Sequence, residues 1–469
     1  MQLLRVIGFI HGIILLLSST IGVGIFMSPQ GVLKYCSLNI PVFLSIWAVC
    51  GLLSLMNALC AAELATTFPV SAASYYFLKR SLGSSVAFLS LWIKLTSHFL
   101  GIGAQSLLIA SNLIQPFYSG CPAPELPKKC LALALLWSFG IFSARRMKTV
   151  ALYQTISSLM KMAVLCLISL TGIVLLVIGR KENVSRFENA LDAKLPDASQ
   201  IVEAFLQVHY SYVGATFLIN IAGEIKNPIE TIPKTLMSGL SIVTLLYLLT
   251  NISYLTVLTP QEIISSDSIA VTWMDRVFPS AQWVISLGLS ASLMNSISCG
   301  IISASRIFYR ASQDGQLPCI YSMLNDHHSP VVAVIMVIIL SSISIIASNI
   351  IYLMKYVGLG SWCISVLHMI GLLKLRYQKP DLPRPYKVWL PFVFGTIALA
   401  VLLIFIPVIQ SPNIEHVYQV VFLLCGLLCY WLQTHINRHT GGVFDMITCY
   451  WQLLFNVSPS EDQDNLIPS

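Results

Sequence analysis

Long apolar segments recur along the whole chain, and polar residues are confined mostly to the short stretches between them. An apolar run of about 20 residues is long enough to cross the hydrocarbon core of a bilayer as a helix. An isolated strand at that depth would leave its backbone groups unpaired, so every segment is expected to be helical. The pattern predicts twelve spans, at 7–34, 41–65, 85–114, 129–143, 151–179, 201–224, 235–258, 281–309, 331–349, 351–373, 388–409 and 417–435.

Composition agrees with this pattern and excludes several other classes of protein. Of the 469 residues, 56% are hydrophobic and only 10% are charged, whereas a soluble domain is about 25% charged. A soluble protein of this length would have too few charges to cover its surface. A disordered chain, a secreted disulfide scaffold and an ordinary cytosolic enzyme are therefore excluded, and an all-α polytopic membrane protein is expected.

The basic residues predict how the chain is oriented. With both termini cytoplasmic, 16 Lys and Arg residues fall on the inner side, 9 on the outer side and 2 within spans. Cytoplasmic loops of membrane proteins carry such an excess. The net charge of +7 is scattered along the chain, so we expect no nucleic-acid partner. We predict one transmembrane domain over 1–435 and a cytoplasmic tail over 436–469, in which the segment 444–455 is typical of an interfacial helix.

The first span carries a polar, glycine-containing stretch at its middle, Ser18-Ser19-Thr20-Ile21-Gly22-Val23-Gly24. Two glycines weaken a helix there, and unwound backbone at membrane depth is tolerated only where it is buried or lines a cavity. The N–H groups that begin the second half-helix can bind a carboxylate. The alternative is a glycine contact between packed helices, and spacing alone leaves both interpretations open.

The sixth span contains a similar interruption, Tyr210-Ser211-Tyr212-Val213-Gly214-Ala215-Thr216. Spans 1 and 6 hold corresponding positions in two halves of five helices, 7–179 and 201–373. Interrupted helices at matching positions are the sequence pointer to the binding site of an inverted-repeat transporter. A packing seam that contains glycine is the alternative here as well.

Few ionisable residues lie within the spans. Lys161 is about ten residues, or roughly 15 Å, from the start of its span. A buried ammonium at that depth is costly unless it meets carbonyls, carboxylates or water, so a functional role is favoured. Lys94 and His98 are four apart and share a helix face, where they either line a cavity or form a polar contact between helices. Glu63 is expected to be a structural partner of a cation from an inner loop.

Two loop residues on the outer side are candidates for covalent modification. Cys121 has no obvious partner in its loop, so it forms an intermolecular disulfide or stays an unpaired thiol. Asn183 begins an Asn-Val-Ser glycosylation sequon. The sequence offers no convincing metal-spaced cluster, phosphate-binding loop or nucleophile triad, so we expect neither a cofactor nor a metal, and an integral-membrane enzyme is disfavoured.

Several segments resemble signature stretches of the amino acid–polyamine–organocation superfamily. The first is the GxGIF pattern at 22–26. The others are AELATTFP at 62–69, YYFL at 75–78, AGEIKNP at 222–228, SASRIFYRASQDGQLP at 303–318 and RPYKV at 384–388. The resemblance covers nearly the whole chain. It is closest to the light subunits of heteromeric amino acid transporters, in the group that contains asc-type and aspartate/glutamate transporters.

The resemblance implies a LeuT-like fold of five plus five inverted helices, with two further helices at 388–435. It implies sodium-independent amino acid transport, usually by exchange, in the plasma membrane. The residues that it marks for the substrate are Thr20, Ile21, Gly22, Val23 and Gly24 for the carboxylate, and Tyr210, Ser211, Val213 and Gly214 for the ammonium, with Tyr210 as an aromatic gate. It also implies that the Lys161 ammonium replaces sodium and that Cys121 is bonded to a single-span heavy-chain glycoprotein.

The sequence departs from the family pattern at two site positions. Val23 replaces a small or hydroxylated residue, and Val213 replaces a glycine, so both add β-branched bulk. Together with the lack of a pocket cation or carboxylate, this bulk favours small neutral amino acids as substrates. An acidic amino acid transporter of the same fold and a transport-inactive partner subunit are the alternatives.

Overall fold

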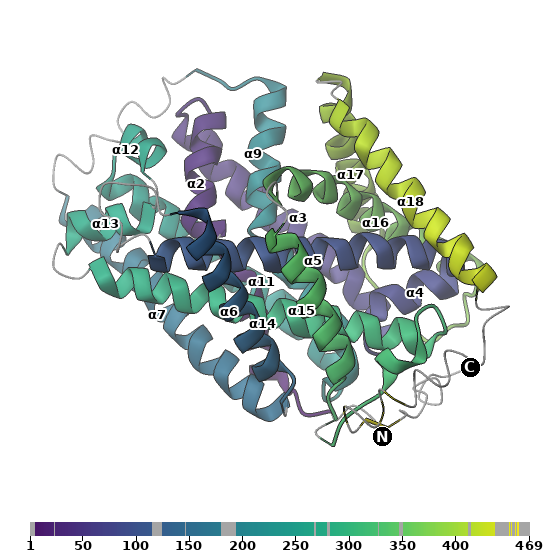
Figure 1. Ribbon diagram of the computed structural model, residues 1–469. Helices are drawn as coiled ribbons and strands as arrows, with labels where there is room; N and C mark the ends of the chain where they lie inside the picture. Colours follow the sequence, from purple (N-terminus) through teal and green to yellow (C-terminus); the bar gives the residue numbers. More distant parts are fainter. Residues whose placement is uncertain are drawn as a thin grey trace.

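The computed structural model describes residues 5–22, 24–114, 124–145, 147–179, 194–266, 269–278, 282–326, 328–346, 350–410 and 414–436, together with 450, 452, 455, 457 and 458. The described part is almost entirely helical (Figure 1). The helices are α1 Phe9–Thr20, α2 Gly24–Tyr35, α3 Ile40–Thr67, α4 Ala73–Leu82, α5 Ser84–Ile114, α6 Glu125–Ser143, α7 Met147–Ile178, α9 Ala198–Tyr210, α10 Phe217–Asn220, α11 Pro228–Val257, α12 Pro260–Ser265, α13 Ile269–Val277, α14 Gln282–Gln313, α15 Val331–Ile346, α16 Ile350–Gln378, α17 Leu390–Gln410 and α18 Ile414–Ile436.

Five helices are long and apolar enough, over the described residues, to cross a bilayer. They correspond to predicted spans 2, 3, 4, 5 and 7. Spans 1 and 6 fall short of that length because each is interrupted at its middle. The qualifying stretches are Ile40–Thr67, Ser84–Ser111, Glu125–Ser143, Leu152–Ile178 and Pro228–Val257.

The interruptions lie where the glycines predict them. The first span ends as α1 at Thr20 and resumes as α2 at Gly24. The sixth span ends as α9 at Tyr210 and continues through the 3₁₀ turn η2, Val213–Thr216, into the single helical turn of α10. A second 3₁₀ turn, η3 at Ala222–Glu224, precedes α11. These short elements bring non-helical backbone to the centre of the molecule.

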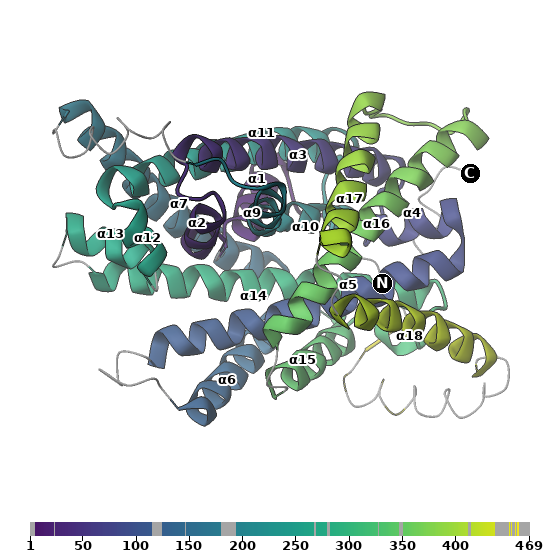
Figure 2. The same ribbon diagram turned by 90° about the horizontal axis from the view of Figure 1, so that it is seen from above.

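The two halves of the chain pack against each other through matching helices. α3 contacts α11, α5 contacts α14, and α6 contacts α15, so second, third and fourth helices of one half each meet their counterparts in the other. Figure 2 shows the interrupted helices α1, α2, α9 and α10 in the middle, with α3 and α11 along one side and α14, α6 and α15 along the other. The interrupted backbone therefore lies between two groups of continuous helices.

Backbone contacts join the start of the described chain to the end of the sixth span. The N–H groups of Val6 and Ile7 donate to the carbonyl of Glu224 at 3.0 and 3.1 Å, and Lys226 N–H donates to the carbonyl of Ile7 at 2.8 Å. The Glu224 carboxylate pairs with Arg306 of α14, and both side chains are buried. This end of the bundle is closed by paired backbone and a buried ion pair.

Three short helices were not expected from the apolar pattern. α4 follows α3 within a predicted inner loop, and α12 and α13 lie between predicted spans 7 and 8. A capping box at Thr259 explains the start of α12, because its hydroxyl accepts from Glu262 N–H while the Glu262 carboxylate accepts from Thr259 N–H. Amphipathic helices of this length are too short to produce a signal in a search for spans of about 20 residues.

Candidate functional site

The two helix breaks pack directly against each other through glycine. A Cβ atom placed on Gly214 would lie closer than 3.0 Å to backbone atoms of Ser19 and Thr20, and one on Gly24 would lie equally close to Ser211. Only glycine permits such an approach of two backbones. The two helices are therefore both interrupted and packed against each other at these glycines, so the two interpretations do not exclude each other.

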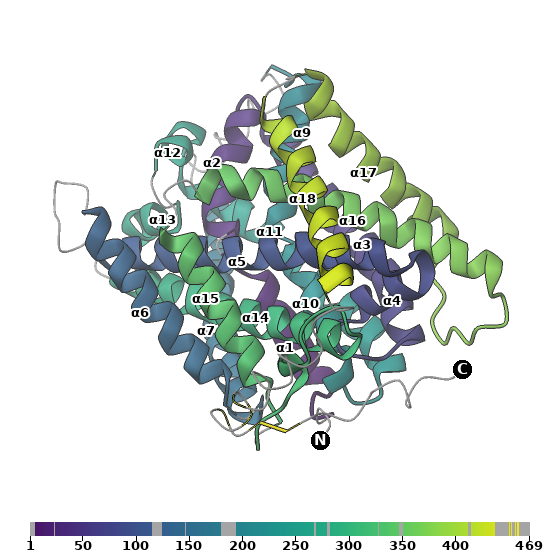
Figure 3. The same ribbon diagram turned by 45° about the vertical axis from the view of Figure 1, so that its right-hand side comes forward.

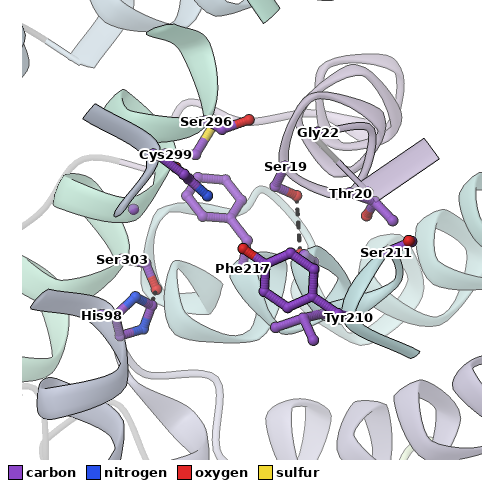
Figure 4. Close-up of a pocket in the computed structure, with 15 residues that line it drawn as sticks. Ser19, Thr20, Gly22, His98, Tyr210, Ser211, Phe217, Ser296, Cys299 and Ser303 are labelled. Atoms are coloured by element: carbon purple, nitrogen blue, oxygen red, sulfur yellow. Dashed lines mark hydrogen bonds between the residues drawn. The ribbon is translucent and has the colours of Figure 1, made fainter. Parts of the chain in front are cut away.

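Side chains hold the two breaks together. The Ser19 hydroxyl donates to the carbonyl of Gly214 at 2.9 Å (Figure 4). The hydroxyl of Tyr247, on α11, lies 3.0 Å from the carbonyl oxygen of Thr20 and 3.1 Å from that of Ser211. Tyr247 thus contacts backbone acceptors of both interrupted spans. Nothing in its sequence position predicted this role, because the contact with Thr20 joins residues 227 positions apart.

Lys161 lies beneath the first break, with a side chain that is only 3% exposed. Its ammonium donates to the carbonyls of Ser18 and Ile21, each at 3.0 Å. The last carbonyls of an interrupted helix have no intrahelical partner and form the negative end of its dipole. The cation therefore pairs with buried carbonyls at the end of α1 that the helix leaves free, as a buried ammonium requires.

A buried polar cluster from α7 and α14 surrounds this contact. Asn295 donates from Nδ2 to the Ser18 hydroxyl at 2.5 Å, and the Gln154 Nε2 donates to Cys299 Sγ at 3.3 Å. The Cys299 thiol lies 3.7 Å from the Ser18 hydroxyl. These side chains anchor the end of α1 to the continuous helices, and nothing in the local sequence around them predicts this role.

A cavity of about 150 Å³ opens beside the two breaks (Figure 4). Among the described residues that line it, none is Asp, Glu, Lys or Arg. The Thr20 hydroxyl is buried and has no partner among the described residues, so it is free to bind a ligand. The lining residues are Ser19, Thr20, Gly22, Gly24, His98, Gln105, Tyr210, Ser211, Val213, Gly214, Phe217, Ser296, Cys299, Gly300 and Ser303.

Most of the predicted substrate residues meet at this cavity. Seven of them line it, and the side chains of Tyr210 and Val213 are 44% and 49% exposed, at its accessible edge. Ile21 does not line it, because its side chain is fully buried and its carbonyl accepts from Lys161. Val23, Cys121 and Asn183 lie outside the described residues, as do most of 444–455 and the tail beyond it.

The remaining ionisable candidates separate into different roles. His98 lines the cavity, with Nε2 3.4 Å from the Ser303 hydroxyl, but Lys94 instead donates to the Ser74 hydroxyl at 2.6 Å. Glu63 forms an ion pair with Arg376 and accepts a hydrogen bond from Arg376 Nε at 2.9 Å. This confirms the prediction that Glu63 is a structural partner of a cation, here one that follows predicted span 10. No group of metal-ligating side chains occurs among the described residues.

Comparison with known proteins gives consistent matches over nearly the whole chain. A family model described as "Amino acid permease" matches residues 7–432. The chain is 72% identical over 464 residues to solute carrier family 7 member 12 of Mus musculus, covering 99% of each. It is 48% identical to solute carrier family 7 member 13 of Homo sapiens, covering 97% of each. It is 31% identical to the human b(0,+)-type amino acid transporter 1, covering 98% of this chain and 94% of the relative.

Proposed function

The chain belongs to the amino acid permease family, and on that premise we propose that it moves small neutral L-amino acids across the plasma membrane by sodium-independent exchange. The family match confirms the resemblance seen in the motifs and makes the chain a multi-pass amino acid transporter rather than an enzyme. Substrate class, ion independence, exchange and location are the proposed part.

The observation that carries sodium independence is the position of the Lys161 ammonium. It donates hydrogen bonds to the carbonyls of Ser18 and Ile21. Carbonyls at an unwound helix are the oxygen ligands that bind sodium ions in transporters that use sodium. A fixed cation at this place repels a second one, and two unit charges 4 Å apart interact by several kcal/mol in a protein environment. We propose that transport therefore proceeds without sodium, because its site is already filled by a side chain.

The cavity supports small, neutral substrates. Its volume of about 150 Å³ is below the range of about 300–1,000 Å³ for pockets that hold drug-sized ligands. We place the substrate carboxylate on the free N–H groups that begin α2 near Gly24, at the positive end of that helix. Its ammonium would face the carbonyls at the end of α9, near Tyr210, which would act as the gate.

The arrangement of helices supports alternating access. The cavity lies between the interrupted helices and the continuous helices α5 and α14, so rocking of one group against the other would open it to either side. The pairing of α3 with α11, α5 with α14 and α6 with α15 supports two inverted repeats, 7–179 and 201–373, within a single domain of twelve spans. The two helices over 388–435 complete this LeuT-like proposal, with both termini cytoplasmic.

The covalent partner is a separate part of the proposal. We propose that Cys121 joins a single-span heavy-chain glycoprotein and that Asn183 is a candidate glycan site; both rest on the sequence. Co-expression with a candidate heavy chain and a non-reducing gel tests the bond. A high-mass band that disappears in Cys121→Ser supports the link, and a band that persists contradicts it.

Two alternatives remain to be tested against the leading proposal. Acidic substrates would require a cation at the cavity, and Lys94 instead contacts Ser74. A transport-inactive partner subunit is motivated by Val213, whose half-exposed side chain narrows the cavity. Purified protein in liposomes preloaded with alanine should take up labelled serine by counterflow, with inhibition by alanine and not by aspartate. Inhibition by aspartate would favour the acidic alternative, and uptake that appears only in Val23→Gly/Val213→Gly would favour the inactive subunit.

A further inference from the structure

A basic corner connects the last turn of α16 to the start of α17. We define the α16–α17 corner as residues 374–390. Figure 3 shows this connection reaching out at the right-hand edge of the molecule. It contains five basic residues and a single acidic one, Asp381. The basic residues are Lys374, Arg376, Lys379, Arg384 and Lys387.

The two arginines are used within the protein and hold the corner in a fixed shape. Arg376 pairs with Glu63 and donates to the carbonyl of Val388 at 2.7 Å, while the Val388 N–H donates to Glu63 at 2.8 Å. Arg384 closes the loop by donating to backbone carbonyls. Its acceptors are Leu375 at 2.9 Å, Lys379 at 2.8 Å, Pro380 at 3.2 Å and Leu382 at 3.2 Å.

The three lysines point outward and remain available. Lys374, Lys379 and Lys387 are exposed, and none of them forms an ion pair within the described part of the chain. Two large aromatic side chains lie beside them in sequence and are also exposed, Tyr377 at 89% and Trp389 at 69%. The Trp389 ring packs edge-on against Phe392, with ring centroids 5.8 Å apart, and still leaves most of its surface exposed. Ion pairing among the described residues therefore does not account for the three lysines.

Apolar side chains continue from this basic and aromatic group along the flanking helices. Ile370 is 44% exposed and lies on the same face of α16 as Lys374 and Tyr377, at positions i, i+4 and i+7, which span roughly 10 Å. On α17, Leu390, which follows Trp389, is 45% exposed, and Phe394, about one turn further, is 56% exposed. A progression from apolar to basic and aromatic side chains is typical of the boundary between hydrocarbon and headgroups.

We propose that the α16–α17 corner binds the headgroup of an anionic phospholipid, with its phosphate on the lysines and its chains along the exposed faces of α16 and α17. The exposed apolar side chains on both flanking helices distinguish a lipid from a soluble anion, because a free phosphate would use only the lysines. Fixation of the corner by Arg376 and Arg384 lowers the ordering cost of binding. The proposal does not depend on the substrate or on exchange.

Lipid retention by the full-length protein tests this inference. Wild-type protein and the triple variant Lys374→Gln/Lys379→Gln/Lys387→Gln are reconstituted in phosphatidylcholine with a tenth phosphatidylserine, extracted in mild detergent, and analysed for bound lipid by native mass spectrometry. The triple Lys→Arg variant serves as the conservative rescue. A charge-matched control removes three other exposed lysines, Lys34, Lys194 and Lys226.

Each basic residue near an anionic surface strengthens binding about fivefold, so the three lysines account for on the order of a hundredfold. We expect the Gln variant to lose bound phosphatidylserine, the Arg variant and the matched control to keep it, and all four proteins to stay monodisperse. Equal retention by wild type and the Gln variant would overturn the proposal, and so would equal loss in the matched control. Displacement of the lipid by millimolar inorganic phosphate would show a soluble-anion site and would also overturn it.

Discussion

Replacing Gly214 by alanine tests the contact between the two broken helices most locally. The added Cβ would meet backbone atoms of Ser19 and Thr20 at less than 3.0 Å, and backbone cannot rotate away as a side chain can. Overpacking of this kind costs about 1–3 kcal/mol. If the added methyl group destabilises the closely packed arrangement by about 2 kcal/mol, that arrangement becomes about thirtyfold less populated than in the wild-type protein. We therefore expect alanine uptake into proteoliposomes, normalised to purified protein, to fall by at least tenfold.

The matched control is Gly101→Ala, on α5. A Cβ at Gly101 meets nothing within 4 Å, and alanine favours a helix interior by roughly 0.5–1 kcal/mol over glycine. This variant should transport at the wild-type rate and unfold at an equal or slightly higher temperature. Wild-type uptake by a monodisperse Gly214→Ala protein would refute the reasoning, because the two breaks would then have room that the structure does not give them.

Three other substitutions test side chains that do not themselves line the cavity. Lys161→Met leaves two buried carbonyls unpaired at about 1–3 kcal/mol each, so we expect a lower unfolding temperature and little uptake at any sodium concentration. Tyr247→Phe removes the hydroxyl that contacts the carbonyls of Thr20 and Ser211. It should lower the uptake rate several-fold while leaving the protein folded. Glu63→Gln leaves the charge of Arg376 uncompensated, which costs about 3–5 kcal/mol; thermal unfolding followed by size exclusion should show a marked loss of stability, and an unchanged midpoint would contradict the predicted pair.

The local features of this protein were predictable because each has a short-range cause. Glycine next to small polar residues predicted where spans 1 and 6 break, and the structure ends α1 at Thr20 and α9 at Tyr210. The cost of burying an ammonium predicted that Lys161 has polar partners, and it has two carbonyls. The depth of Glu63 at the end of its span predicted an ion pair with an inner cation.

The assembly of the site was not predictable to the same degree. Tyr247, Asn295 and Cys299 look like ordinary polar or small residues in apolar helices, and their roles arise only when α11 and α14 pack on α1. The sequence left open whether Lys94 lines the cavity, because a helix face can turn toward either neighbour. Packing against α4 settles it, since the ammonium reaches Ser74.

The central claim is that the Lys161 ammonium replaces sodium at the first helix break. The most direct measurement is the initial rate of labelled serine counterflow into proteoliposomes, with sodium and with an equal concentration of choline on both sides. With the Lys161 ammonium at the carbonyls of Ser18 and Ile21, we expect equal rates in the two buffers. A rate that requires sodium and rises with its concentration would show that the Lys161 ammonium does not replace the ion.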